Sequence, residues 1–159
     1  MDKLKYISGD LVMTNGVPLG TTKDVVYRVT SSDPSKTLKL DDGTVLKGVV
    51  CLENIEGAEF GEKGYLSGDC CAWVKDIVPI NLVPAILEKN GWFEDSFLDS
   101  YKSFYKNNRN YPSLHGQNTQ NGYAFDIDIG ETNIMTNVNY VHQLQHLLFG
   151  LGLNLEMEV

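Results

Sequence analysis

Short runs of alternating or β-branched apolar residues, separated by turn residues, dominate the first 80 residues. Asp41-Asp42-Gly43 lies between two such runs and is typical of a hairpin turn, whereas Ser31–Lys36 contains Pro34 and is predicted to be a polar loop. Five strands spaced by glycine-rich turns predict a small five-stranded β-barrel, SH3-like or OB-like, over residues 1–80. The predicted strands are Leu11–Met13, Val25–Thr30, Thr37–Leu40, Thr44–Leu52 and Ala72–Val78.

Residues 81–159 show a different pattern, in which helical spacing alternates with strand spacing. Pro84 at a first-turn position and Gly91 after Asn90 are typical of the two ends of a short helix. The predicted elements are helices at Pro84–Asn90, Glu94–Lys106 and Val138–Gly150, strands at Tyr123–Ile129 and Leu153–Val159, and a long loop at Asn107–Asn121. We therefore expect an α+β fold, in which the barrel is followed by a helix–strand–helix–strand unit packed on it in one compact domain.

Composition and charge narrow the function classes. The chain has 159 residues, of which 42% are hydrophobic and 21% charged, as is usual for a globular domain. With 21 acidic and 13 basic residues the formal charge is −8, which argues against binding to long nucleic acids or to anionic membranes. No apolar run is long enough to cross a bilayer, and the first six residues hold no apolar segment typical of a secretion signal. We expect a cytoplasmic protein.

The three cysteines, Cys51, Cys70 and Cys71, are an odd number without a secretion signal, which favours reduced thiols. Cys70 and Cys71 are adjacent, so in a strand their side chains point to opposite faces and do not share one metal ion. The sequence therefore predicts small, partly buried cysteines rather than a catalytic thiol or a metal site.

Two segments resemble a known family. Residues 77–93, IVPINLVPAILEKNGWF, and residues 140–149, YVHQLQHLLF, are similar to segments that occur in the same order in small uncharacterised proteins of Bacteroidetes bacteria and of their phages or prophages. Val83 departs from the threonine usual at that helix cap. The resemblance implies a phage-associated origin, and with it the host cytoplasm as the compartment, but it implies no particular reaction.

A dense row of neutral hydrogen-bonding side chains lies on the last predicted helix: His142, Gln143, Gln145 and His146. His142 and His146 are four residues apart, as in some zinc sites, and His115, Asp126 or Asp128 are the candidates for a third ligand. The glutamate that follows the first histidine in zinc proteases is replaced by Gln143. We favour a ligand-binding or helix-edge role for the row and predict no metal and no catalytic residue. Asp126 and Asp128 are interpreted as the solvated face of a strand.

Aromatic and basic residues gather between residues 73 and 123. Tyr101, Lys102, Tyr105 and Arg109 offer stacking surfaces and cations for a phosphate, which suits a small anionic nucleotide. We therefore predict a non-catalytic binding protein without a cofactor, in its sharpest form a phage counter-defence protein that sequesters a host nucleotide signal. The alternatives are a protein–protein adaptor or virion-associated module, and a small metal-dependent hydrolase using His142 and His146. A homo-oligomer is also expected, because an edge strand at Leu153–Val159 needs covering.

Overall fold

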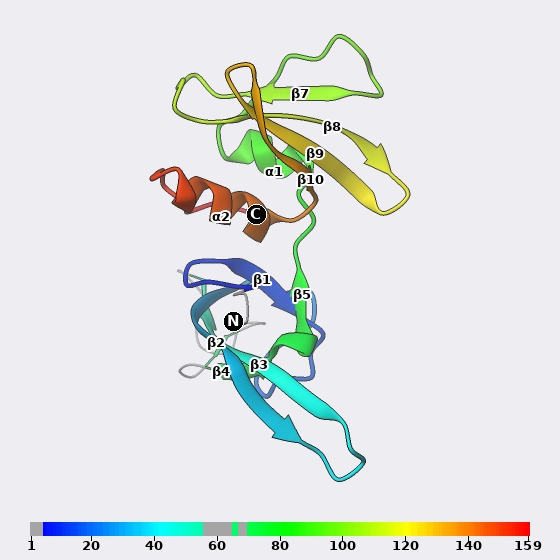
Figure 1. Cartoon of the computed structure of the whole chain (residues 1–159), viewed down its shortest axis with the longest axis vertical. Coiled ribbons are helices and arrows are strands. Elements are labelled where there is room, and N and C mark those ends of the chain that lie inside the picture. Colours follow the sequence, from blue (N-terminus) through cyan, green and yellow to red (C-terminus); the bar gives the residue numbers. More distant parts are fainter. Residues whose placement is uncertain (1–4, 56–64, 67–69) are drawn as a thin grey trace. The chain divides into compact units, whose positions relative to one another are not determined.

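The computed structural model describes residues 5–55, 65–66 and 70–159, and the chain divides into two compact units, Met1–Ile80 and Asn81–Val159 (Figure 1). Strands account for 46% of the structure and helices for 13%, in two antiparallel sheets. The predicted α+β fold is therefore wrong: the protein is mostly β. The sequence pattern also changes at residue 80, and the packing of the two parts into one compact domain stays a prediction.

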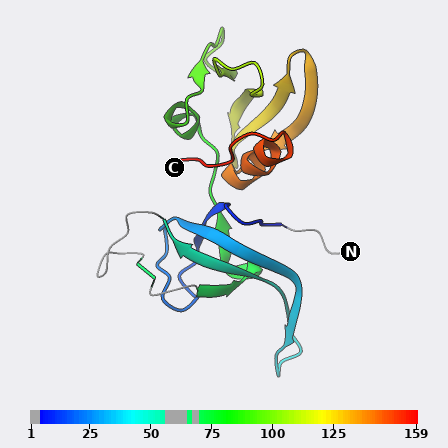
Figure 2. The ribbon, with the colours of Figure 1, turned by 90° about the vertical axis from the view of Figure 1, so that its left-hand side faces the viewer.

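The first unit contains one five-stranded sheet of order β4-β3-β2-β1-β5. Its elements are β1 (Leu11–Thr14), β2 (Tyr27–Lys39), β3 (Val45–Asn54), β4 (Cys70–Trp73), the 3-10 helix η1 (Val74–Asp76) and β5 (Ile77–Pro79). The long hairpin of β2 and β3 turns at residues 40–44, which include the predicted turn Asp41-Asp42-Gly43, and extends beyond the other strands (Figure 2). The predicted barrel is not closed, since β4 and β5 form opposite edges of the sheet rather than pairing with each other.

Alternating apolar residues of these strands form the core of the first unit. Most of these core residues are at apolar positions of the strands that the sequence pattern predicted. Burial of these side chains explains the positions of the strands. The fully buried members include Tyr6, Val12, Tyr27, Val29, Val50 and Leu52.

Two predictions for the first unit are wrong. The expected loop Ser31–Lys36 lies inside β2, where register shifts after Val29 and after Asp33 let the strand bulge around Pro34. Gly48 of β3 takes a positive φ of 84° near this bulge, a conformation that suits glycine. The expected strand Ala72–Val78 is interrupted by η1, so it supplies two strands at opposite edges of the sheet. The glycine-rich stretch at Gly57, Gly61, Gly64 and Gly68 lies outside the described residues.

Asp76, at the end of η1, ties this connection to β1. Its carboxylate accepts hydrogen bonds from Asn15 Nδ2 at 2.9 Å and from Lys75 Nζ at 2.8 Å, and its carbonyl oxygen accepts one from the Asn15 amide at 3.0 Å. Burial alone would raise the pKa of Asp76, but the hydrogen bonds from Lys75 and Asn15 outweigh it and hold the pKa below its usual value.

We expect Asp76→Asn to destabilise the protein by about 1–3 kcal/mol at pH 7, because it removes a charged acceptor from a buried site. A lowered pKa means that the ionised carboxylate contributes fully above the unfolded-state pKa of about 3.9, and that this contribution is lost as the pH falls through the lower folded-state pKa. Urea unfolding of both proteins should therefore give a difference that shrinks below about pH 4. A difference independent of pH would contradict this role; Lys75→Ala, at a half-exposed partner, is the control with a small expected effect.

The second unit contains one antiparallel sheet of order β10-β9-β8-β7-β6 and two helices. Its elements are α1 (Pro84–Lys89), β6 (Phe93–Glu94), β7 (Lys102–Tyr105), β8 (Ser113–Thr119), β9 (Gly122–Ile129), β10 (Thr132–Val138) and α2 (Val141–Gly150). Both helices lie on the same side of this sheet (Figure 1). The predicted first and last helices and the predicted strand at Tyr123–Ile129 are therefore confirmed, with shifts of a few residues at their ends.

The second sheet has one apolar and one polar face. Phe104, Leu114, Phe125 and Ile127 are fully buried and alternate with polar residues along β7, β8 and β9. The Phe104 and Phe125 rings pack edge to face, with centroids 6.1 Å apart. Buried residues of the two helices complete this core, chiefly Leu87, Val141, Leu144 and Leu148. The opposite face of the sheet is left with the polar side chains.

Other expectations for the second unit are wrong. The predicted helix Glu94–Lys106 is a hairpin of β6 and β7, the predicted loop Asn107–Asn121 contains β8, and β10 was not predicted. Residues 153–159 form no strand. The edge strand that motivated a homo-oligomer is thus absent, and the homo-oligomer stays a prediction.

The C-terminal segment instead docks through polar contacts. Asn90, which follows α1, accepts a hydrogen bond from the Glu158 amide at 2.8 Å and donates one to the Glu158 carbonyl at 2.7 Å. Gln145 of α2, fully buried, donates to the Leu155 carbonyl at 3.1 Å. These bonds hold residues 155–158 without any strand pairing.

Among the residues that the structure describes, neither helix has the length and apolar character required to cross a bilayer.

Candidate functional site

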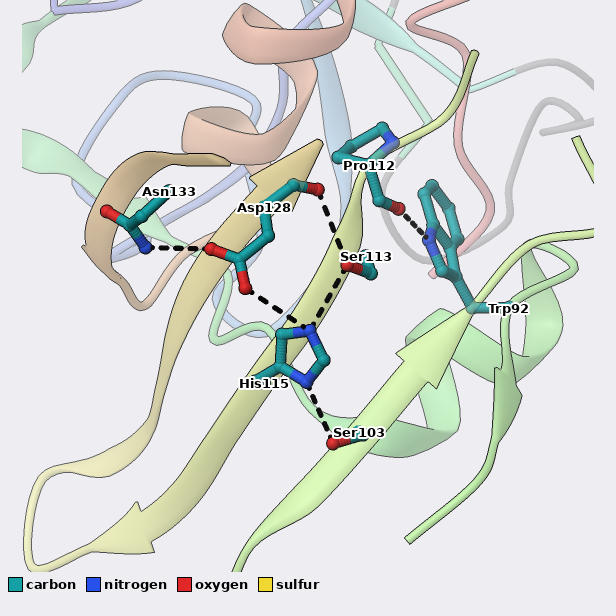
Figure 3. A network of polar contacts seen from close by, with 7 residues as sticks. All are labelled: Trp92, Ser103, Pro112, Ser113, His115, Asp128 and Asn133. Carbon is teal, nitrogen blue, oxygen red and sulfur yellow. Dashed lines mark hydrogen bonds and ion pairs between the residues drawn. The ribbon is translucent and has the colours of Figure 1, made fainter. Parts of the chain in front are cut away.

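The polar face of the second sheet carries a hydrogen-bonded network around His115 (Figure 3). His115 Nδ1 lies 2.8 Å from Ser103 Oγ, and His115 Nε2 lies 3.1 Å from Ser113 Oγ. The same Nε2 is 3.4 Å from Asp128 Oδ2, and the other carboxylate oxygen of Asp128 accepts a hydrogen bond from Asn133 Nδ2 at 2.9 Å. Both ring nitrogens of His115 therefore have polar partners.

The register of three strands brings these residues together. Ser103 of β7 lies opposite His115 of β8, and Ser113 of β8 lies opposite Asp128 of β9. Ser113 and His115 are two residues apart, as are Asp126 and Asp128, so each pair shares the polar face. The Ser113 hydroxyl also donates to the Asp128 carbonyl at 3.4 Å.

A serine, a histidine and an aspartate in a row are also the groups of a hydrolytic triad. In a triad the serine and the aspartate contact different ring nitrogens of the histidine. Here Ser113 Oγ, at 3.1 Å, and Asp128 Oδ2, at 3.4 Å, both face the same nitrogen, His115 Nε2. We therefore assign to this network the role of fixing the His115 ring and the Asp128 carboxylate on the sheet.

Tyrosines flank the network. The Tyr105 ring packs edge to face on His115, with centroids 5.5 Å apart. Burial raises the pKa of the Tyr101 phenol above its usual value, and the nearby negative charges of Asp126 and Asp128 add to the rise. Asp126 lies opposite His115 in the register of β8 and β9 and is half-buried, and its carboxylate has no hydrogen bond or ion pair with any residue that the structure describes. Tyr101, Tyr105, His115, Asp126 and Asp128 are hereafter the acidic–aromatic face.

The four residues predicted to bind a nucleotide do not share one surface, because they lie on different faces of β7 and in the turn that follows it. Tyr105 lies on the acidic–aromatic face and Tyr101 lies just before β7, whereas Lys102 alternates with Ser103 and forms an ion pair with Glu94 at 3.0 Å. The hydrogen bond to Glu94 raises the pKa of Lys102. Arg109 is exposed in the turn before β8. The predicted group is therefore not one cluster, and nucleotide binding stays a prediction.

The predicted row on α2 has structural contacts. Gln143 Oε1 accepts hydrogen bonds from the Asn139 and Tyr140 amides at 2.9 and 3.1 Å and so caps the helix start. Gln145 is buried and binds the C-terminal segment. His142 is buried, with its ring stacked on Tyr140 and edge to face with His146. The residues described include no group of three or more histidine, cysteine, aspartate or glutamate side chains placed to hold a metal ion.

A lysine held between two aromatic rings is a further feature that the sequence did not predict. Lys106 Nζ lies 4.3 Å from the Trp92 ring centroid and 4.0 Å from that of Tyr111. Burial lowers the pKa of Lys106. Trp92 is in turn fixed by its hydrogen bond from Nε1 to the Pro112 carbonyl at 3.1 Å. The ammonium group of Lys106 is thus engaged by two aromatic rings of the same unit.

Comparison of the chain with protein-family models, with curated proteins and with solved structures finds no match in any of the three.

Proposed function

We propose that this is a non-catalytic binding protein, and specifically an adaptor that receives a basic segment of a protein partner on the acidic–aromatic face. The observation that carries the proposal is Asp126, a half-buried carboxylate without a hydrogen bond or ion pair among the described residues. Because no side chain among the described residues occupies this carboxylate, a cation or hydrogen-bond donor of a partner can bind it without displacing an internal contact.

The neighbours of Asp126 favour an organic cation as that group. Asp128 adds a second carboxylate, and Tyr101 and Tyr105 add ring faces that attract ammonium and guanidinium groups. Arginine matches this combination best, since its planar group binds a carboxylate through two hydrogen bonds and stacks on an aromatic ring.

The hairpin next to this face supplies apolar contact area, which favours a protein segment over a free small cation. Phe97 is 95% and Leu98 64% exposed in the connection between β6 and β7, and Phe93 and Tyr101 are also exposed. Large exposed apolar residues that lie close together are typical of interaction surfaces. The backbone bond from the Tyr101 amide to the Leu98 carbonyl, at 3.3 Å, orders this connection.

The excess of acidic residues in the second unit also favours a basic protein segment over an anionic nucleotide as the ligand. Residues 81–159 hold nine acidic and four basic side chains. Of the four, Lys102 is paired with Glu94 and Lys106 is held between two rings. An anion approaching the acidic–aromatic face would meet two carboxylates.

We expect a blocked hexa-arginine peptide to bind the full chain at low ionic strength in a calorimetric titration. Asp126→Asn with Asp128→Asn should weaken this binding by about tenfold or more, because charge-assisted hydrogen bonds contribute about 1.5–3 kcal/mol each. The control, Asp41→Asn with Asp42→Asn, makes the same charge change in the exposed turn between β2 and β3 and should leave the binding nearly unchanged.

Equal weakening in the two double variants would mean unspecific attraction to an acidic protein and would overturn the proposal. Binding of a cyclic dinucleotide instead, abolished by Arg109→Ala, would favour the nucleotide-sequestering hypothesis.

A further inference from the structure

Two cysteines face each other across neighbouring strands of the first unit. Cys51 of β3 and Cys71 of β4 are direct partners in the antiparallel register. Their Sγ atoms are 2.7 Å apart, and both are free thiols. Directly opposed residues of an antiparallel pair have Cα atoms about 4.5–5.5 Å apart, within the range that disulfides span. The backbone therefore already holds the two thiols at bridging distance.

We propose that Cys51 and Cys71 form a redox-active dithiol, which a small-molecule disulfide such as oxidised glutathione converts to a cross-strand disulfide. In the first step the Cys71 thiolate attacks one sulfur of the small disulfide, forms a mixed disulfide and releases one thiolate, which takes up a proton. In the second step the Cys51 thiolate attacks Cys71 Sγ, and the second small thiolate leaves and is protonated. Two protein thiols are oxidised and one small disulfide is reduced to two thiols.

The surroundings set the order of these steps. Cys71 is exposed and can meet the reagent, whereas Cys51 is half-buried and is placed to resolve the mixed disulfide. The hydrogen bond with Cys51, together with burial, raises the pKa of the Cys71 thiol. The reaction should therefore be slow at neutral pH and accelerate as the pH rises, since the thiolate is the nucleophile.

The third cysteine provides a matched control within the same strand. Cys70 lies one residue from Cys71, so its side chain points to the opposite face of β4. Its Sγ donates to the Leu19 carbonyl at 3.2 Å rather than facing another thiol. Cys70 should therefore keep its thiol under conditions that oxidise the Cys51–Cys71 pair.

The test uses the full reduced chain incubated with oxidised glutathione, followed by thiol counting, intact-mass measurement and mapping of disulfide-linked peptides. The expected result is loss of two of the three thiols, a mass lower by two hydrogens and a linked peptide containing Cys51 and Cys71. Cys70→Ser should close the same bridge. Cys71→Ser and Cys51→Ser should not lose two hydrogens, and Cys51→Ser should instead accumulate the glutathione adduct on Cys71.

Because the peptide map is made on the unaltered protein, a folding defect in a variant does not decide the outcome. A stable glutathione adduct on Cys71 of the unaltered chain, or a bridge that includes Cys70, would overturn the proposal. Closure should also raise the melting temperature by about 5 °C or more, because the bridge constrains the unfolded chain between the two strands.

Discussion

Gly116→Ala is expected to destabilise the second unit by about 3 kcal/mol or more. Gly116 lies in β8, between Lys102 of β7 and Phe125 of β9. A Cβ atom at this position would overlap the Ala124 carbonyl oxygen and approach Phe125 Cδ1 to 2.9 Å. The first of these contacts is with backbone, so no side-chain rotation relieves it.

Thermal unfolding and amide hydrogen exchange measure this effect. Amides of β8 and β9 should lose protection in Gly116→Ala, while those of β2 and β3 in the first unit keep theirs. Gly150→Ala is the matched control: Gly150 is the last residue of α2, and a Cβ atom there would meet nothing within 4 Å. That change should be neutral or slightly stabilising, since alanine favours helix more than glycine does. Equal stability of the two variants would show that the sheet tolerates a side chain at Gly116.

Deletion of residues 153–159 is the second change with a large expected effect, a loss of about 2–4 kcal/mol of stability. The deletion removes the Leu155 carbonyl that Gln145 binds and both backbone groups of Glu158 that Asn90 binds. Gln145 is fully buried in the intact chain, and its amide would lose this acceptor.

Urea unfolding of the truncated chain checks this expectation, and light scattering of the same samples reports any change of oligomeric state. Asn90→Ala should reproduce part of the loss, because it removes both bonds to Glu158, together with the bond from Asn90 to the Ile86 carbonyl, and leaves Gln145 untouched. Glu156→Gln alters an exposed side chain of the same segment and should have little effect. Unchanged stability after the deletion would mean that the docked segment contributes nothing to the fold.

The sequence predicted those elements that have local signals of their own. Pro84 and the Asn90-Gly91 pair mark the ends of α1, and Asp41-Asp42-Gly43 marks the turn of the β2–β3 hairpin. The alternation of apolar and polar residues was by itself sufficient to predict β9, because the apolar face of this strand carries its buried residues and the polar face does not. Each of these signals lies within about ten residues, and no distant contact is needed to interpret it.

The segment Glu94–Lys106 was misassigned because a spacing of four residues is not unique to a helix. Phe97, Tyr101 and Tyr105 recur at one turn of a helix, but the same spacing arises here because Phe97 and Tyr101 lie in the connection between β6 and β7 and only Tyr105 lies in a strand. The structure resolves the ambiguity through pairing of β7 with β6 and β8. Pairing partners are distant in the sequence and could not be derived from it.

The same reason explains what was missed at the candidate site. The shared face of Asp126 and Asp128 was predicted correctly from their spacing, and His115 was considered only as a metal ligand. Ser103 and Asp128 lie on either side of His115 because of the register between β7, β8 and β9. This register could not be derived from the sequence. A shift of one residue in either pairing would send His115 to the apolar face.

The 3-10 helix η1 has a consequence for the order in which the first unit folds. Three residues carry the chain from one edge of the sheet to the other, so β1 gains its second neighbour only when β5 arrives, with Thr14 pairing to Ile77 about 60 residues later. The β2–β3 hairpin, by contrast, closes through a turn of a few residues. During synthesis the hairpin can therefore form early, whereas the β1–β5 pairing must wait until residue 79 has left the ribosome. The unit should accordingly complete its fold late, with closure of its longest-range pairing as the step that limits the rate.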